Sequence, residues 1–160
     1  MRRAKAALAL TCVALPCLFL AACSGSKTFE GIWHLDPEHT TMPRGFNVKA
    51  ESYMQIEMKG DGMDIHDYLV SPETGKFPLM DRHYTLDGRE HVAESDGNST
   101  LYVSARLEGS TLTIRERIVH HDADAPSPET RASVTYVLSR FGGTMIGTDE
   151  SGKIATYERQ

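Results

Sequence analysis

Apolar and polar residues alternate at every second position over long parts of this chain, and this pattern constrains the fold more than any other feature. It is clearest in the segments 48–59, 101–108, 112–118 and 132–139. A two-residue period is that of a β-strand, and an apolar face opposite a polar face is typical of antiparallel sheets. No segment of the chain body shows a sustained helical stripe. The sequence therefore predicts an all-β protein.

Glycine-containing turns separate the alternating segments at intervals of about eight to thirteen residues, which predicts a meander of about 8–10 strands. Closing such a sheet into an antiparallel up-and-down barrel would bury every apolar face and remove exposed edges, so we expect a barrel. A two-sheet sandwich is the alternative. Two connections, 71–78 and 121–130, contain too many prolines for central strands and are expected to be long loops.

The first residues have the layout of a secretory signal peptide. Arg2, Arg3 and Lys5 precede an uncharged run over 6–22. This run is shorter than the roughly twenty apolar residues of a spanning helix, and it contains Pro16. We therefore expect a removable leader over residues 1–22.

The leader ends in Leu20-Ala21-Ala22-Cys23, which resembles the bacterial lipobox. The resemblance implies that Cys23 carries fatty acyl chains such as palmitate, that 23–28 is a short tether and that 29–160 is the barrel domain. Two or more acyl chains give stable anchoring, so a membrane is an expected partner. Ser24 resembles the residue that permits sorting to an outer membrane, which implies a lipid-anchored protein of the cell envelope that faces the periplasm.

Removal of the leader changes the thiol content and the charge. Cys12 and Cys17 leave with it, so no disulfide or thiolate metal site is expected in the mature chain. The formal net charge falls from −5 to −8, because the leader holds three basic residues and no acidic one. An acidic chain without a basic cluster speaks against nucleic acid as a partner. A transmembrane barrel is also disfavoured, since the aromatic girdles of that class are missing.

The segment Phe29-Glu30-Gly31-Ile32-Trp33-His34-Leu35-Asp36-Pro37 resembles the opening strand of lipocalin-like proteins, and of small bacterial lipocalin-like domains in particular. The G-x-W of that family places a tryptophan across the closed end of a barrel, which implies barrel-closing roles for Gly31 and Trp33. A basic residue near the last strand packs over the tryptophan in the family. Arg159 and Arg140 are both candidates.

The resemblance implies that a small apolar or amphipathic ligand binds inside the barrel. Glu116 interrupts an otherwise apolar strand face, and Asp67 does the same on another strand, so both are candidate ligand contacts. Tyr136 and Met54 are further candidates on inward positions. A fully filled interior is the alternative, and the methionines fit it equally well.

One loop carries metal-ligand chemistry. His120, His121, Asp122 and Asp124 supply two imidazoles and two carboxylates suited to zinc, copper or nickel, although a solvated polar loop gives the same sequence. The remaining histidines are scattered, and no H-x-H or H-E-x-x-H spacing joins them: His34, His39, His66, His83 and His91.

The sequence lacks a nucleophile elbow and a dinucleotide fingerprint, so it predicts a protein that is not an enzyme and needs no cofactor. Ligand binding or transport in the cell envelope is the expected function. The alternative is an interaction module with a filled barrel that acts through the loops 71–78 and 121–130.

Overall fold

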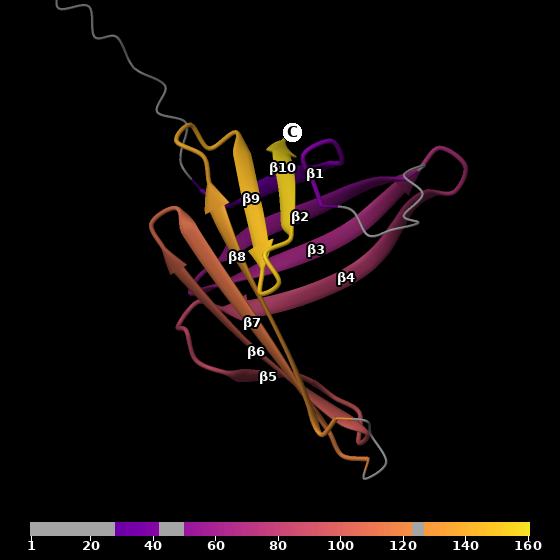
Figure 1. The fold of residues 1–160 in the computed structure, drawn as a ribbon, viewed down its shortest axis with the longest axis vertical. Helices are drawn as coiled ribbons and strands as arrows, with labels where there is room; N and C mark the ends of the chain where they lie inside the picture. Colours follow the sequence, from indigo (N-terminus) through magenta and orange to yellow (C-terminus); the bar gives the residue numbers. More distant parts are fainter. Residues whose placement is uncertain (1–27, 42–49, 123–126) are drawn as a thin grey trace, which may run out of the picture.

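The structure is a computed structural model of the chain, and it describes residues 28–41, 50–122 and 127–160. These residues form ten antiparallel strands in one sheet (Figure 1). None of the described segments is a helix long and apolar enough to cross a membrane. The strands are β1 (Gly31–Asp36), β2 (Glu51–Lys59), β3 (Gly62–Ser71), β4 (Gly75–Thr85), β5 (His91–Ser95), β6 (Ser99–Glu108), β7 (Thr111–His120), β8 (Glu129–Leu138), β9 (Thr144–Asp149) and β10 (Ile154–Arg159).

Strands that follow one another in sequence pair with one another, except at a single place. The order across the sheet is β4-β3-β2-β1-β10-β9-β8-β7-β6-β5, so β1 and β10 join the two ends of the chain. Strands β4 and β5 are consecutive in sequence but form the two edges of the sheet, which curls into a nearly closed barrel (Figure 1). The barrel prediction is confirmed, and the two-sheet alternative is wrong. All ten strands lie within 31–159, so residues 24–160 contain the complete barrel.

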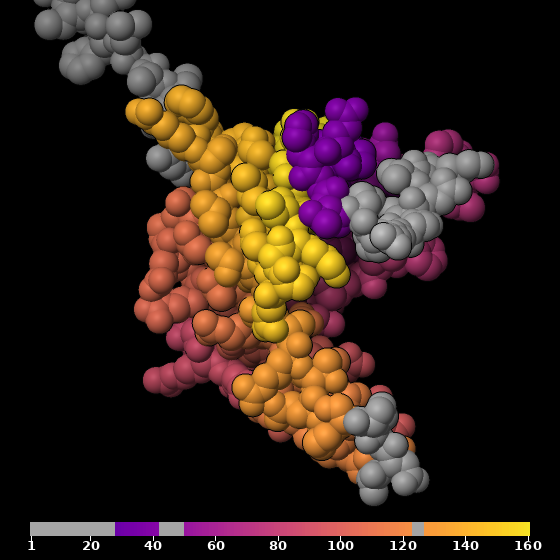
Figure 2. All heavy atoms as spheres, in the orientation of Figure 1, coloured from indigo at the N-terminus to yellow at the C-terminus, as the bar shows by residue number. Residues whose placement is uncertain are grey.

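The barrel is filled at one end. Inward positions such as Ile56 and Ile65 alternate with outward polar ones, as the sequence predicts, and the space-filling view shows a compact body above a projecting arm (Figure 2). Burial of these side chains is the main source of folding free energy. The buried cluster consists of Phe29, Trp33, Met54, Ile56, Met63, Ile65, Tyr84, Val103, Ala105, Leu112, Ile114, Tyr136, Leu138 and Met145.

Trp33 is fully buried at this closed end. Its indole Nε1 donates a hydrogen bond of 2.8 Å to the carbonyl of Phe29. The Arg159 guanidinium lies over the indole ring, 4.5 Å from its centroid, which is a cation–π contact. Of the two candidate arginines, Arg159 is therefore the one that covers the tryptophan, whereas Arg140 lies 5.7 Å from the ring of the exposed Phe141.

The same guanidinium binds the backbone of two segments outside β10, the residues before β1 and the β8–β9 connection. Arg159 donates hydrogen bonds to the carbonyls of Glu30 at 2.7 Å, Gly142 at 2.9 Å and Thr28. Gly31 has a φ of 140°, and a Cβ there would lie 3.1 Å from Arg159 Nη1. A glycine is needed at this position for both reasons.

The two connections predicted to be long loops, 71–78 and 121–130, are shorter in the structure. Gly75–Pro78 belongs to β4, so the connection after β3 is only a tight turn. Pro78 is tolerated because β4 is an edge strand and because the β3–β4 register shifts between Asp67 and Tyr68, which leaves Leu79 as the extra residue of a bulge. The second loop also ends earlier than expected, since β8 begins at Glu129.

Replacement of Arg159 by methionine should destabilise the barrel by about 2–4 kcal/mol, because three charge-assisted hydrogen bonds and the cation–π contact are lost. Urea unfolding followed by the fluorescence of Trp33, the one tryptophan in the sequence, measures this. Arg140→Met is the matched control, and its free energy of unfolding should stay within about 0.5 kcal/mol of the wild-type value. Equal midpoints for the two variants would contradict this account of the closed end.

Candidate functional site

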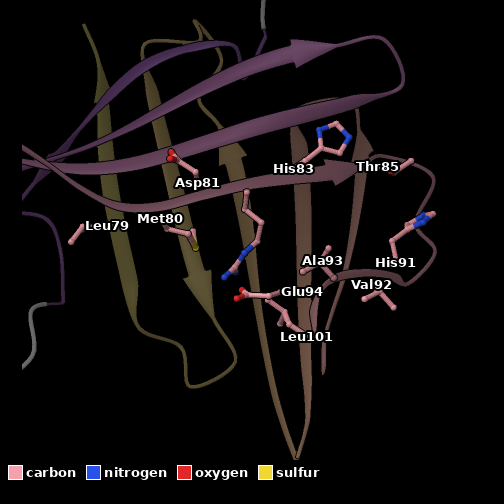
Figure 3. A pocket seen from close by; sticks show the side chains of 12 residues that line it. Leu79, Met80, Asp81, His83, Thr85, His91, Val92, Ala93, Glu94 and Leu101 are labelled. Carbon is pink, nitrogen blue, oxygen red and sulfur yellow. The ribbon is translucent and has the colours of Figure 1, made fainter. Parts of the chain in front are cut away.

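A pocket of about 510 Å³ opens where the barrel is not closed by hydrogen bonds, between the edges of β4 and β5 (Figure 3). The β4–β5 connection is tied to β6 instead, because the Gly88 amide donates to the Ala105 carbonyl at 2.9 Å. Strand β5 is short, exposed throughout and irregular between Val92 and Glu94. The walls are formed by Leu79–His83 and Thr85 of β4, His91–Glu94 of β5, and Leu101 and Val103 of β6.

Apolar side chains form part of the rim and part of the floor of this pocket, alongside polar and charged ones. Leu79 and Val92 stand at the rim and are 53% and 60% exposed. Leu101 is half-buried and Val103 is buried, and both point inward from β6. Solvent-exposed apolar side chains around a pocket mark a surface that binds other molecules.

An ion pair crosses the barrel interior beside the pocket. Arg82 of β4 donates to the Glu116 carboxylate of β7, although these two strands are not neighbours in the sheet. The Tyr84 hydroxyl donates to the same carboxylate oxygen at 3.1 Å. Burial, followed by the charge of Glu116, raises the pKa of Tyr84, so its hydroxyl stays a donor at neutral pH. The inward charge of Glu116 thus has two partners, and Arg82 connects it to the pocket wall.

Asp67 is a second carboxyl group on the inward face, opposite Met80 in the β3–β4 register. It is half-buried, and burial raises its pKa to about 6, against the opposing charges of Arg82 and His66. Within the part of the chain that the structure describes, no hydrogen bond or ion pair holds its side chain. Burial, together with the charge of Asp67, also raises the pKa of Tyr157 to about 12.

Tyr136 is buried near Tyr157 and Asp67. Its ring lies 6.3 Å from that of Tyr157, tilted by 60°. Gly147 makes room for it, since a Cβ at that position would lie 2.8 Å from Tyr136 Cε1. Met54 belongs to the filled closed end. None of the four predicted ligand contacts lines the pocket between β4 and β5: Tyr136, Met54, Asp67 and Glu116.

Three residues of this region were not singled out from the sequence: Arg82, Tyr84 and Glu94. The alternation of β4 contained a usable signal, because Met80, Arg82 and Tyr84 share the face opposite Asp81 and His83. An arginine between two inward apolar positions is a charge that needs a partner. Its partner lies 34 residues away in sequence, which the local pattern does not reveal.

Two histidines that appear scattered in the sequence meet on the outer face of β3 and β4. The repeated pattern Asp-x-His, as Asp64-Ile65-His66 and Asp81-Arg82-His83, is in antiparallel register. It produces two crossed pairs, His83 Nδ1 to Asp64 at 2.6 Å and His66 Nδ1 to Asp81 at 2.7 Å. No H-x-H or H-E-x-x-H spacing joins these histidines in the sequence, and the structure brings them together through their aspartate partners instead.

Glu57, Asp64 and His66 also place three potential metal-ligand atoms within 4.8 Å of one another. Lys59 already holds this position, since its ammonium pairs with Asp64 and lies 3.5 Å from Glu57. The hydrogen bond from Lys59, ahead of that from His83, lowers the pKa of Asp64. The arrangement is a neutralised ion-pair network on the sheet surface.

The predicted metal loop is described only in part. Nε2 of His121 lies 2.9 Å from the Thr100 hydroxyl, and the His120 amide donates to the Pro128 carbonyl at 3.0 Å. Asp122 has interactions of its own. Asp124 lies outside the described residues, as does the predicted lipidation site Cys23. A metal role for this loop stays a prediction.

No protein-family model matches this chain, and no curated protein matches it in sequence. Solved structures do match its fold. They include a protein described as REP1-NXSQ fatty acid transporter, with a TM-score of 0.50, 14% identity and coverage of 82% of this chain and 95% of that one. A mutant of the fluorescent protein UnaG matches with a TM-score of 0.51 and 14% identity, and the match covers 82% of this chain and 96% of that one. A secretary abundant heat soluble protein from Ramazzottius varieornatus matches with a TM-score of 0.50 and 14% identity, and the match covers 82% of this chain and 95% of that one. At this identity the similarity establishes a lipocalin-like barrel and nothing finer.

The raised pKa of Asp67 makes stability depend on pH in a defined direction. The folded state binds this proton up to about pH 6, whereas the unfolded chain releases it near pH 4, so the contribution of Asp67 to stability falls as the pH rises between these values. Asp67→Asn should therefore have a free energy of unfolding about 1–3 kcal/mol higher than that of the wild type at pH 7.5. At pH 4 the free energies of unfolding of the two proteins should differ little.

Urea unfolding of both proteins at the two pH values measures this difference. The control is Asp81→Asn, which removes a carboxyl group that is 69% exposed on the outer face. A gain for Asp67→Asn of the same size at both pH values would show that Asp67 does not titrate as the structure indicates.

Proposed function

We propose that the barrel binds a small amphipathic molecule that enters between β4 and β5. The observation that carries this proposal is the pocket of about 510 Å³ at the one unpaired seam of the described sheet. Small-molecule sites are typically pockets of about 300–1,000 Å³. This pocket has a volume in that range and combines apolar side chains with polar and charged ones. The apolar tail would lie against Leu101 and Val103, and the polar end would reach the ion pair of Arg82 and Glu116.

The division of the interior supports this proposal. The closed end is filled by the core around Trp33, and the pocket of about 510 Å³ lies on the side where β4 and β5 separate, so the ligand is placed on that side. The similar structures include a protein described as a fatty acid transporter. This shows that the same barrel shape can serve apolar cargo, and it favours binding over catalysis for the present chain.

We further propose that the protein is anchored to a membrane of the bacterial cell envelope through lipid on Cys23, facing the periplasm. Arg159 binds the Thr28 carbonyl, so the chain joins the barrel at its closed end. Four residues lie between Cys23 and Thr28, and the five Cα–Cα steps that join them span at most about 18 Å. The anchored barrel would then hold its closed end toward the bilayer.

Ligand binding is tested first on residues 24–160 exported to a bacterial periplasm. Native mass spectrometry with organic extraction should show a stoichiometric apolar adduct, and the protein should bind the neutral fluorescent probe N-phenyl-1-naphthylamine. Leu101→Trp places an indole in the pocket and should weaken probe binding by about tenfold or more, because the tail loses its space.

The matched control is Val137→Trp, which adds the same ring to an outward position that is 43% exposed. It should bind the probe like the wild type. A bare mass together with no probe binding would exclude the proposed function, and equal binding by both tryptophan variants would exclude this pocket as the site.

The anchor is tested with the full-length chain expressed in a Gram-negative bacterium. Labelled palmitate should be incorporated into the wild type, and the protein should sediment with membranes. Cys23→Ala should abolish the label and release the protein, because no second acylation site is expected. Cys17→Ala, within the leader, is the control and should keep the label; labelled Cys23→Ala protein would contradict the proposal.

A further inference from the structure

The charges inside the barrel are unbalanced, and this imbalance bears on which ligand the proposed site would accept. Arg82 is the only lysine or arginine among the residues that line the pocket. Its guanidinium is bonded to Glu116, and both side chains are shielded, with 20% and 28% exposed. The single fixed positive charge at the site is therefore already compensated.

Glu116 is held firmly in that pair. It accepts hydrogen bonds from Arg82 and, at 3.1 Å, from the Tyr84 hydroxyl. A ligand carboxylate that sought Arg82 would have to replace Glu116 and leave it without its cation. Breaking one partner away from a shielded ion pair is strongly unfavourable.

One further carboxyl group lines the pocket, and another lies inside the barrel near Arg82 without lining the pocket. Asp67 is half-buried on the inward side of β3. Glu94 points from β5 into the pocket (Figure 3). With Glu116, they set three carboxyl groups against one guanidinium.

The imidazoles at the pocket do not reverse this balance. His83 is bonded to Asp64 at 2.6 Å and His91 to Asp87 at 3.0 Å, so each faces a carboxylate of its own. Asp81, the remaining acidic group of the wall, is bonded to His66 on the outer face.

We infer that the pocket selects amphiphiles whose polar end is a protonated amine or an uncharged hydroxyl, and that it rejects free fatty acids. This inference rests on the proposed function and specifies its ligand class. A protonated amine gains attraction from Glu94, which lines the pocket, and from the more distant charge of Asp67. A hydroxyl can hydrogen-bond to Glu94, and a carboxylate meets repulsion from both carboxyl groups.

The test compares three twelve-carbon amphiphiles as competitors of N-phenyl-1-naphthylamine bound to residues 24–160 at pH 7.5, below their micelle concentrations. Dodecylamine and dodecanol should displace the probe, and dodecanoate should be weaker than dodecanol by about tenfold or more. Probe binding with equal or tighter competition by dodecanoate would overturn the inference while the proposed function stands. No probe binding and no dodecanol binding would overturn both.

Glu116→Gln supplies the specific readout. It keeps the shape and a hydrogen-bond acceptor for Arg82 but frees the guanidinium charge, so dodecanoate should gain about tenfold relative to dodecanol. Glu94→Gln, at an exposed position that folding tolerates, should shift the ratio in the same direction by a smaller factor.

The control for these variants is Glu108→Gln, whose carboxylate is exposed and pairs with Arg106 at 2.6 Å. It should leave the dodecanoate-to-dodecanol ratio unchanged. An unchanged ratio in both Glu116→Gln and Glu94→Gln would show that these charges do not select the ligand.

Discussion

The pairing of β1 with β10, fastened by Arg159 over Trp33, is the constraint on which the rest of the structure depends. It joins the two ends of the chain and turns a ten-stranded meander into a barrel. One side chain from the last strand holds the carbonyls of Thr28, Glu30 and Gly142 and covers the buried indole. The filled core beneath this end stabilises the curl that brings β4 back toward β5.

The candidate site exists because closure stops short at the opposite seam. The bulge at Leu79 and the irregular, fully exposed β5 keep the two edges from pairing. Unpaired strand edges are a risk for aggregation, which proteins usually limit by short edge strands, bulges and charged side chains. All three are present here, so the seam remains open as a pocket while the ends of the sheet stay protected.

Charge inside the barrel gives the pocket its chemical character. The pair of Arg82 and Glu116 bridges strands that share no backbone hydrogen bonds, and it therefore helps to hold the two sides of the open seam together. Asp67 and the buried tyrosines lie around it. The barrel shape alone does not identify a ligand, because specificity resides in the polar groups of the site.

Local pattern was enough to determine the strands and the barrel, because side-chain alternation and turn glycines act over a few residues. The tryptophan at the closed end was expected only from the resemblance of the opening strand to lipocalin-like proteins. The same pattern showed that Glu116 and Asp67 break apolar faces, yet it misjudged 71–78 as a loop, since tolerance of Pro78 depends on β4 being an edge. Only the tertiary structure decided that Arg159 rather than Arg140 covers Trp33, and that Arg82 forms an ion pair with Glu116. It also decided that two Asp-x-His patterns meet in register. These contacts join strands by sheet register or across the barrel, and both depend on how the whole sheet pairs and curls, which no local stretch of sequence specifies.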